Sequence, residues 1–383
     1  MFNRLVSFIR EQYRTQEFIP LHAPVFRGRE RELVLDTIDS TFVSSVGAYV
    51  DRFERDMATF AGSPRAIAVM NGTAALHMAL KLVGVDQGDL VATQSLTFVA
   101  TCNAIAYCGA EPLFIDVDRH TLGLSPKALD EWLSEHAMVD DAGDCRTRDG
   151  HRRIRACLPM HTFGHPVDLD ALVAICDRWK LALVEDAAES LGSYYKGRHT
   201  GTFGRIGTLS FNGNKIMTTG GGGMLLTDEV IGKRAKHLTT TAKTPHPYEF
   251  VHDEVGYNYR LPNLNAALGV AQLEQLPAFI ESKRALAQRY IDFLKDSPLA
   301  PIVEPAQCRS NYWLNGVVCE DAAQRDALLK STNDSGVMTR PIWALMNRLP
   351  HYTNALRGPL TNAEWLEARV VNLPSSVLPI TAI

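Results

Sequence analysis

Apolar runs of strand length alternate with amphipathic stretches of helical length through the first 228 residues of the chain. After residue 72, for example, Leu76, Leu80 and Val83 recur at helical spacing. Alternating strands and helices predict an α/β fold, with a mostly parallel central sheet that is covered by helices on both faces. The predicted strands are 66–70, 89–93, 112–118, 154–161 and 181–184.

Two parts of the chain lie outside this pattern. Apolar residues recur at helical spacing in the first 20 residues, which predicts a helical arm without chemistry of its own. The stretch 251–276 leads into a long helix that reaches about Ser297, and shorter strands and helices follow. We therefore expect an arm at 1–20, a large domain at 21–260, and a C-terminal part at 261–383 with the long helix and a smaller α+β domain. The polar segment 135–153 is expected to form an exposed loop or hairpin.

The composition excludes several classes of protein. Hydrophobic residues make up 46% of the chain and charged residues 21%, with a net charge of −4 and no basic stripe, so we expect no nucleic-acid partner. The seven cysteines are scattered without a C-x-x-C pair, which predicts reduced thiols rather than a disulfide framework or a zinc site. No signal peptide and no run of 18 uncharged apolar residues occur, so we expect a cytoplasmic protein without a membrane segment or a bound metal.

The stretch LSFNGNKIMTTGGGGMLLTD (209–228) carries the strongest candidate for chemistry. Lys215 follows small polar residues and precedes four consecutive glycines, Gly220 to Gly223, which let the backbone bend sharply or approach a ligand closely. Burial lowers the pKa of a lysine and frees its amine as a nucleophile. We therefore interpret Lys215 as a lysine that forms a Schiff base with pyridoxal phosphate (PLP). The alternative is a solvated lysine beside a glycine turn.

Three further positions are expected at the same edge of the sheet. Thr73 begins a helix directly after a strand, where free N–H groups favour an anion, although it could be an ordinary helix cap. Phe98 follows the next strand and could stack on a flat ring or belong to the core. Asp186 follows the apolar run 181–184, where a carboxylate needs a cationic partner such as a protonated pyridine nitrogen, unless it caps a helix.

Five motifs occur in order along the chain: NGTAAL, LTFVAT, VEDAAES, LSFNGNK with its glycine run, and GYNYRLPNLNAALG. Together they resemble the sugar aminotransferases of the DegT/DnrJ/EryC1/StrS family, from about residue 19 to 377. The resemblance implies the PLP-dependent transferase fold type I, PLP as cofactor, L-glutamate as amino donor, and a homodimer with shared active sites.

The resemblance also assigns roles to positions that match the family's motifs. Lys215 matches the Schiff-base lysine, and Asp186 matches the partner of the pyridinium nitrogen. Phe98 matches the aromatic residue that stacks on the cofactor ring, and Asn258 matches a residue that reaches the phosphate of the neighbouring subunit. The phosphate-binding positions match Gly72, Thr73, Ala74 and Ser210.

Glu189 departs from the family pattern, because many members have Gln at this position. A glutamate can donate a hydrogen bond to the pyridine hydroxyl only when it is protonated. Related chains in which the lysine is replaced, often by His, are dehydratases, so the presence of Lys215 favours transamination. In that reaction the freed Lys215 amine acts as general base and acid.

Further stretches resemble the subgroup that aminates C4 of UDP-linked 4-keto-6-deoxy-N-acetylhexosamines, on the route to legionaminic acid or bacillosamine in surface polysaccharide biosynthesis. These stretches are STFVSSVG, MHTFGHP, HLTTTAKTPHPYEFVHDE, CRSNYWLN and MTRPIW. They imply UDP-4-keto-6-deoxy-N-acetylglucosamine as substrate, and Phe26, His161, Tyr312 and Arg340 as substrate contacts. His161 could instead be a core histidine, and Arg340 could form a surface salt bridge.

Three other functions remain open at this point. The first is the same reaction on GDP-4-keto-6-deoxymannose, as in a perosamine synthase. The second is a regulator with this fold that catalyses nothing, which the intact Lys215 and Asp186 argue against. The third is a nucleotide-binding module at Gly220 to Gly223, which is disfavoured because neither G-x-x-x-x-G-K-[ST] nor a strand followed by G-x-G-x-x-G occurs there.

Overall fold

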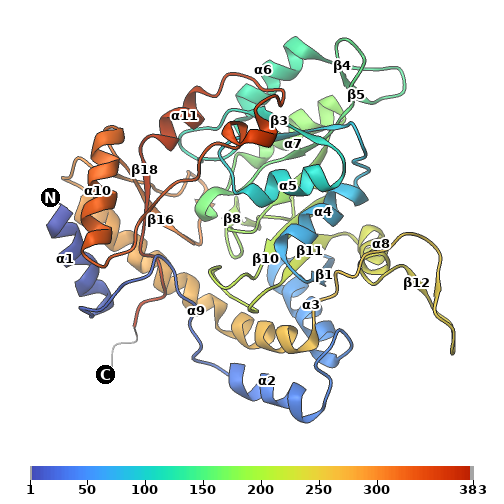
Figure 1. The fold of residues 1–383 in the computed structure, drawn as a ribbon, viewed down its shortest axis with the longest axis horizontal. Helices are drawn as coiled ribbons and strands as arrows, with labels where there is room; N and C mark the ends of the chain where they lie inside the picture. Colours follow the sequence, from blue (N-terminus) through green and yellow to red (C-terminus); the bar gives the residue numbers. More distant parts are fainter. Residues whose placement is uncertain (1, 380–383) are drawn as a thin grey trace.

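A central seven-stranded sheet organises the computed structural model, which describes residues 2–379 (Figure 1). The strands lie in the order β1-β11-β10-β7-β6-β2-β3. Strand β11 runs antiparallel to both of its neighbours, and the remaining neighbours pair in parallel. The predicted mostly parallel sheet is therefore confirmed. Its strands are β1 Arg65–Val69, β2 Leu90–Gln94, β3 Glu111–Ile115, β6 Ile154–Leu158, β7 Ala182–Asp186, β10 Ile206–Ser210 and β11 Gly223–Thr227.

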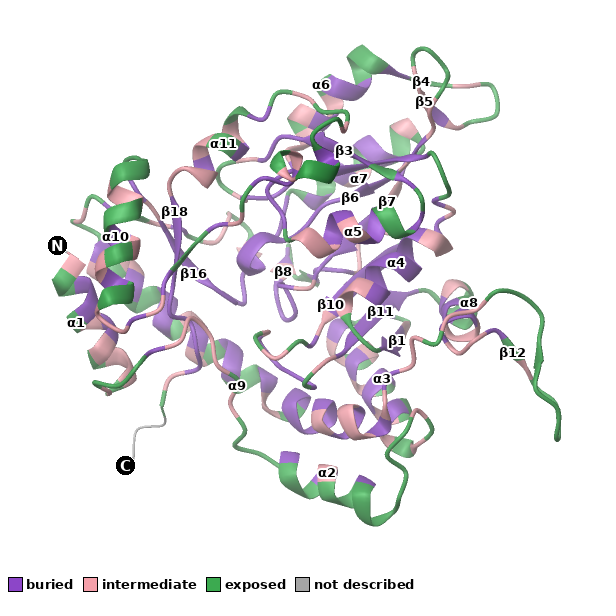
Figure 2. Cartoon of the chain, in the orientation of Figure 1, coloured by how far each residue is buried: buried purple, intermediate pink, exposed green. Residues whose placement is uncertain are grey.

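Helices cover both faces of this sheet, because alternate strand residues point to opposite sides. In β1, Ile67 and Val69 pack in one apolar cluster with α4, α5 and α8, whereas Ala66 and Ala68 pack in another with α3 and α9. Helices α6 and α7 extend the second layer under β2, β3 and β6. Figure 2 shows the strands between these layers as buried. The helices are α3 Ala48–Ala61, α4 Gly72–Leu82, α5 Val99–Tyr107, α6 Pro126–His136, α7 Leu169–Trp179, α8 Glu229–Thr239 and α9 Asn263–Leu294.

A smaller α+β layer follows at the far end of α9. Its antiparallel sheet has the order β14-β16-β18-β17, and α1 packs here against α9 and α10 (Figure 1). The rings of Phe8 and Phe293 stack with centroids 4.2 Å apart, so the N-terminal helix is tied to the C-terminal part. The expected divisions at residues 20 and 260 stay predictions. The elements are α1 Phe2–Tyr13, β14 Ala300–Pro301, β16 Asn315–Val318, α10 Ala322–Asp334, β17 Arg340–Pro341, α11 Thr361–Glu367 and β18 Val370–Leu373.

Two hairpins leave the layered body. Strands β4 (Ala137–Val139) and β5 (Cys145–Thr147) pair antiparallel, which confirms the hairpin predicted within 135–153. Strands β12 (Lys243–Thr244) and β13 (Val251–His252) form the other, which projects from the body beyond α8 (Figure 1). Outside these hairpins, helix α2 and the small sheet β15-β8-β9 complete the main elements. Their bounds are α2 Glu30–Asp39, β8 Tyr194–Tyr195, β9 Arg198–His199 and β15 Cys308–Arg309.

Within residues 2–379, every helix is too short or too polar to span a lipid bilayer. All seven cysteines are free thiols, and six of them are buried.

Candidate active site

A cavity of about 300 Å³ opens where the carboxyl ends of β7 and β10 meet the first turns of α4 and α5. Open α/β sheets bind ligands at this edge, because the loops that leave the strands diverge there. The lining residues come from segments that lie far apart in sequence. They are Asn71, Gly72, Thr73, Leu76, Phe98, Ala100, Met160, Asp186, Ala188, Glu189, Ser210, Asn212, Asn214, Lys215, Gly221, Gly222, Trp313 and Trp343.

The first turn of α4 forms one wall of the cavity. The N–H groups of Gly72 and Thr73 lie in this turn, where backbone donors have no partner within the helix. Asn71 caps the helix and accepts a 2.8 Å hydrogen bond from the N–H of Ala74. Ala74 is buried, does not line the cavity and has already used its donor, so the expected phosphate contact from Ala74 is not supported.

Ser210, at the end of β10, lies directly beside this turn. A Cβ atom at Gly72 would lie 2.8 Å from Ser210 Cβ, closer than side-chain carbons approach. Glycine at position 72 therefore allows α4 to begin against β10. The two N–H groups and the Ser210 hydroxyl form a cradle of donors at the positive end of a helix dipole, which suits a phosphate group.

Asp186 is the last residue of β7 and is only 3% exposed. Its Oδ2 accepts a 2.8 Å hydrogen bond from the Thr101 hydroxyl, and its Oδ1 accepts one from the Ala188 N–H at 3.2 Å. Burial raises the pKa of Asp186, and the hydrogen bonds together with the positive charge of Lys215 oppose this rise. A cationic ligand would stabilise the charged form of this carboxylate, which burial disfavours.

Lys215 lies in the turn after β10, and its side chain is 12% exposed. Its Nζ lies 3.3 Å from Glu189 Oε1 and 3.9 Å from the centroid of the Trp313 ring. This burial disfavours the alternative of a solvated lysine, while the Schiff-base role of Lys215 stays a prediction. The other carboxylate oxygen of Glu189 accepts a 2.9 Å hydrogen bond from the Phe163 N–H.

The glycine run reverses the chain after Lys215. Gly220 adopts a positive φ of 79°, and β11 then pairs antiparallel with β10 so that Gly223 lies opposite Ser210. A Cβ at Gly223 would lie 2.4 Å from the carbonyl oxygen of Asn71. The glycines therefore bring the chain back alongside the strand that carries Ser210, as expected, and β11 passes close to the start of α4.

Aromatic side chains form the remaining walls. Phe98 caps α5 and is 49% exposed at the cavity, so it is not a core residue. Trp313 and Trp343 were not predicted from sequence, although each stands within a stretch used for the finer resemblance, CRSNYWLN and MTRPIW. The only sequence signal for Trp313 was its place beside the predicted contact Tyr312. Trp343 stands three residues after the predicted contact Arg340, and no other signal pointed to it.

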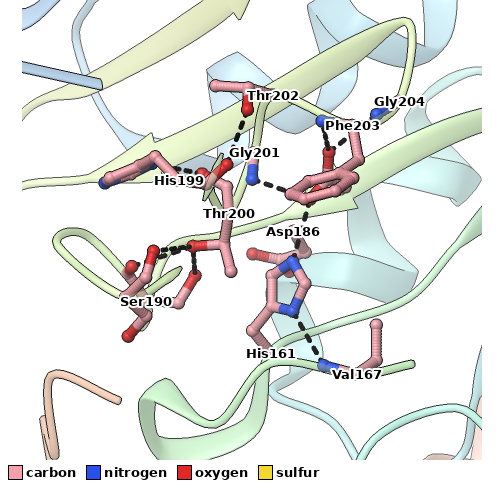
Figure 3. A network of polar contacts seen from close by, with 12 residues as sticks. His161, Val167, Asp186, Ser190, His199, Thr200, Gly201, Thr202, Phe203 and Gly204 are labelled. Atoms are coloured by element: carbon pink, nitrogen blue, oxygen red, sulfur yellow. Dashed lines mark hydrogen bonds and ion pairs between the residues drawn. The ribbon is translucent and has the colours of Figure 1, made fainter. Parts of the chain in front are cut away.

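His161 belongs to a buried network behind the cavity rather than to its lining (Figure 3). Its Nδ1 accepts a hydrogen bond from the Val167 N–H at 3.3 Å, so its Nε2–H donates to Glu185 Oε2 at 3.1 Å. Both ring nitrogens are therefore engaged. The expected contact between His161 and substrate is not supported, and the alternative of a core histidine fits this geometry.

Glu185 is fully buried, and its carboxylate is saturated with donors. Besides His161, it accepts hydrogen bonds from the N–H groups of Gly201, Phe203 and Gly204 at 2.6–2.7 Å. Burial acts to raise the pKa of Glu185, but the contacts with His161 and the backbone donors outweigh it and lower the pKa. Glu185 therefore holds the loop after β9 as a stable buried anion.

Four predicted contacts lie outside the cavity lining. Phe26 is 54% exposed elsewhere, and Arg340 is exposed in β17. Tyr312 is buried, where its hydroxyl accepts a 3.0 Å hydrogen bond from the Glu304 N–H, and its neighbour Trp313 faces the cavity instead. Asn258 is exposed near the β12–β13 hairpin. A single chain therefore does not bring these four residues to Lys215.

Comparison with known proteins agrees with this geometry. The model of the DegT/DnrJ/EryC1/StrS aminotransferase family matches residues 25–378. GDP-perosamine synthase of Escherichia coli O157:H7 is 36% identical over 361 residues, which are 94% of this chain and 93% of the relative. The putative pyridoxal phosphate-dependent aminotransferase EpsN of Bacillus subtilis (strain 168) is 37% identical over 345 residues, or 88% and 84% of the two chains.

Solved structures confirm the predicted fold. The aminotransferase TlmJ from Streptoalloteichus hindustanus superposes with a TM-score of 0.84 at 30% identity, covering 94% of this chain and 93% of that one. The family match and this superposition both extend over the central sheet and the C-terminal layer. The chain belongs to the DegT/DnrJ/EryC1/StrS aminotransferase family, and it is a PLP-dependent aminotransferase.

Proposed function

We propose that this protein transfers the amino group of L-glutamate to C4 of a nucleotide-linked 4-keto-6-deoxy sugar. One observation carries the proposal: the Lys215 amine, the Asp186 carboxylate and the free donors of the α4 turn all face one cavity. This is the set of groups that a PLP-dependent transamination requires.

The residues of the cavity fit PLP. The N–H groups of Gly72 and Thr73, with the Ser210 hydroxyl, would hold its phosphate, because they form the donor cradle at the start of α4. Asp186 would face the ring nitrogen, and Phe98 would cover the ring. When bound, PLP supplies an aldehyde that takes up the amino group and a protonated ring that withdraws electrons from the substrate carbon.

The chain's own residues then control protons. Asp186 keeps a proton on the ring nitrogen, because a buried carboxylate stabilises a neighbouring cation. Lys215 acts as base and then as acid at the reacting carbon. Its amine lines the cavity and can take up a proton and give it back. Trp313 and Trp343 narrow the cavity and keep water from the site.

Glu189 can donate a hydrogen bond to the cofactor only when its carboxyl group is protonated, and its surroundings favour that form. Burial raises the pKa of Glu189, and the charge of Lys215 and the Phe163 N–H act against this rise. The net rise favours the protonated acid, which can donate to the pyridine hydroxyl once Lys215 has moved away. A protonated Glu189 therefore supplies the same hydrogen-bond donor as the Gln that many family members have at this position.

Two nucleotide sugars are candidates. Three relatives that are 33–36% identical are named GDP-perosamine synthases, which favours GDP-4-keto-6-deoxymannose. The motifs CRSNYWLN and MTRPIW, which hold Trp313 and Trp343, favour UDP-4-keto-6-deoxy-N-acetylglucosamine. Because the relatives match over more than nine-tenths of this chain, we place the GDP-linked sugar first.

We also propose that the active form is a homodimer with shared sites. Asn258 lies on an exposed segment outside the cavity, so it can meet a cofactor phosphate only across an interface. The neighbouring hairpin exposes large apolar side chains, Tyr248 at 82% and Phe250 at 80%, as expected of a surface that a second chain covers. Light scattering of the purified protein tests the oligomeric state.

The test of function is an assay with PLP, L-glutamate and each ketosugar in turn, read by 2-oxoglutarate formation and by the mass of the amino sugar. We expect faster amination of the GDP-linked sugar, and a loss of at least about 100-fold in Lys215→Ala. Faster amination of the UDP-linked sugar would reverse the order of the two candidates. No amination of either sugar would reject this substrate class.

A further inference from the structure

The Lys215 ammonium lies between two groups. Glu189 Oε1 lies 3.3 Å from Nζ on one side, and the face of the Trp313 ring lies 3.9 Å from Nζ on the other. An ion pair and a cation–π contact both stabilise the charged form of the amine, and both strengthen when water is excluded.

Hydrogen bonds connect Trp313 to the segments that carry Lys215 and Glu189. Its indole N–H donates a 2.8 Å hydrogen bond to the carbonyl of Asn214, the residue before Lys215. Its backbone N–H donates to the side-chain oxygen of Asn311 at 2.8 Å. The Asn311 amide in turn donates to the carbonyl of Glu189 at 2.9 Å. Lys215, Trp313 and Glu189 are therefore linked in a closed ring of contacts through two asparagines.

A free ammonium in this cavity has a competing partner. Asp186 lines the same cavity, and the charge of Lys215 acts on its carboxylate. If the ammonium paired directly with Asp186, it would occupy the group that the cofactor ring nitrogen needs. The ion pair formed in the structure is with Glu189 instead.

We propose that Trp313 and Glu189 form a resting site for the free Lys215 ammonium, and that Trp313 is a positioning residue that keeps this amine away from Asp186. The inference rests on the proposed function, in which Lys215 is free for part of each reaction cycle. It concerns a state of this chain alone, so it can be tested in cofactor-free protein without turnover.

The experiment measures the rate at which an amine-acylating reagent labels Lys215 at fixed pH, by mass spectrometry of the Lys215 peptide. Exposed Lys127 serves as the internal standard. Trp313→Leu removes the ring face, so the ammonium loses stabilisation, and we expect the labelling of Lys215 to become about tenfold faster. Trp313→Phe keeps a ring face and should show less than half of that increase on a logarithmic scale.

Trp343→Leu is the matched control, because Trp343 lines the same cavity and, within residues 2–379, forms neither a hydrogen bond nor a cation–π contact with Lys215. Both Leu variants widen the cavity, so any faster labelling in Trp313→Leu than in Trp343→Leu reports the lost ring contact. Equal labelling rates in these two variants would overturn the inference. If Trp313→Leu does not fold, Trp313→Met, which also lacks a ring face, takes its place with the same criterion. Neither result depends on which sugar the enzyme uses.

Discussion

Lys215 and Lys283 are both withdrawn from solvent, but their surroundings differ. Lys215 faces a cavity and has a carboxylate and an aromatic face as partners. Lys283 lies fully buried in α9, where its amine donates to the carbonyl of Ser375, and no carboxylate of residues 2–379 pairs with it. Burial lowers the pKa of Lys283 to about 7. A lowered lysine pKa therefore does not mark the amine that we propose as catalytic, whereas its access to the cavity does.

His22 extends the contrast. Both of its ring nitrogens are buried without a partner within residues 2–379. Burial lowers its pKa far below the ordinary value, and the charges of Lys283 and Lys215 act in the same direction. The region around Lys283 is thus a polar interior of neutral groups, whereas the region around Lys215 balances charges against one another.

The largest predicted effect is a difference in turnover between variants of the two lysines. Lys215→Ala should lower turnover by at least about 100-fold, because the general base at the reacting carbon is lost. Lys283→Met, which removes a buried amine of similar length, should keep turnover within about threefold. Steady-state 2-oxoglutarate formation measures both. A comparable loss in both variants would mean that the two regions are coupled in catalysis.

A second prediction concerns the carboxylate that Lys215 does not pair with. Asp186→Asn keeps the shape of the side chain but removes the charge that holds the ring proton, and we expect turnover to fall by about 100-fold. Thr101→Val removes only one hydrogen bond to Asp186 and should cost about tenfold. An equal loss of turnover in Asp186→Asn and Thr101→Val would show that the position of the Asp186 side chain matters and that its charge does not.

A third prediction concerns the donor cradle. Gly72→Ala places a Cβ against Ser210, and the clash pushes α4 away from β10. Overpacking of this kind costs about 1–3 kcal/mol, so PLP should bind roughly 5- to 150-fold more weakly. Titration of apoprotein with PLP, followed by absorbance, measures the change. Gly62→Ala provides a comparison, because its Cβ would meet no atom within 4 Å, although its φ of 65° adds backbone strain.

The last prediction tests the Lys283 region through stability. The pKa of Lys283 is about 7 in the folded chain and has its ordinary value of 10.5 in the unfolded chain. Between these values the unfolded chain binds the extra proton, so the free energy of unfolding should rise with pH, by up to about 1.4 kcal/mol per pH unit from this group. Below pH 7 both states are protonated, and the folded chain carries the full penalty of a buried charge.

Urea unfolding of wild type and Lys283→Met at pH 7, 8 and 9 measures this contribution. The difference between the two proteins should shift in favour of wild type as the pH rises. A difference that stays constant with pH would contradict the assignment of a neutral buried lysine.

Local sequence patterns marked the candidate positions that depend on strand ends, and the family resemblance was needed to assign their roles. Lys215, Asp186, Phe98 and the turn at Gly72 follow apolar runs, and parallel strands bring their carboxyl ends to one edge. The alternation along β7 could not show which of Glu185 and Asp186 faces the cavity. His161 was misplaced for a related reason, since its partner Glu185 points to the opposite side of the strand.

The contacts from the C-terminal part were harder to predict. Trp313 lines the cavity, whereas its neighbour Tyr312 is buried and has a positive φ of 47°. A left-handed residue interrupts the regular alternation of side chains, so a sequence pattern does not show which of the two faces the cavity. Tyr312, Arg340 and Phe26 were carried over by resemblance alone, and the contact proposed for Asn258 needs a second chain, which one sequence does not place.

The end of β7 carries two neighbouring carboxylates whose pKa values shift in opposite directions. Burial raises the pKa of Asp186, whereas the contacts that saturate Glu185 lower its pKa. The carboxyl group that lines the cavity is thus the one whose affinity for a proton is raised, and the one behind it is held as an anion that keeps the loop after β9 in place. One step along the strand therefore separates a group whose charge depends on its ligand from a group whose charge is part of the fold.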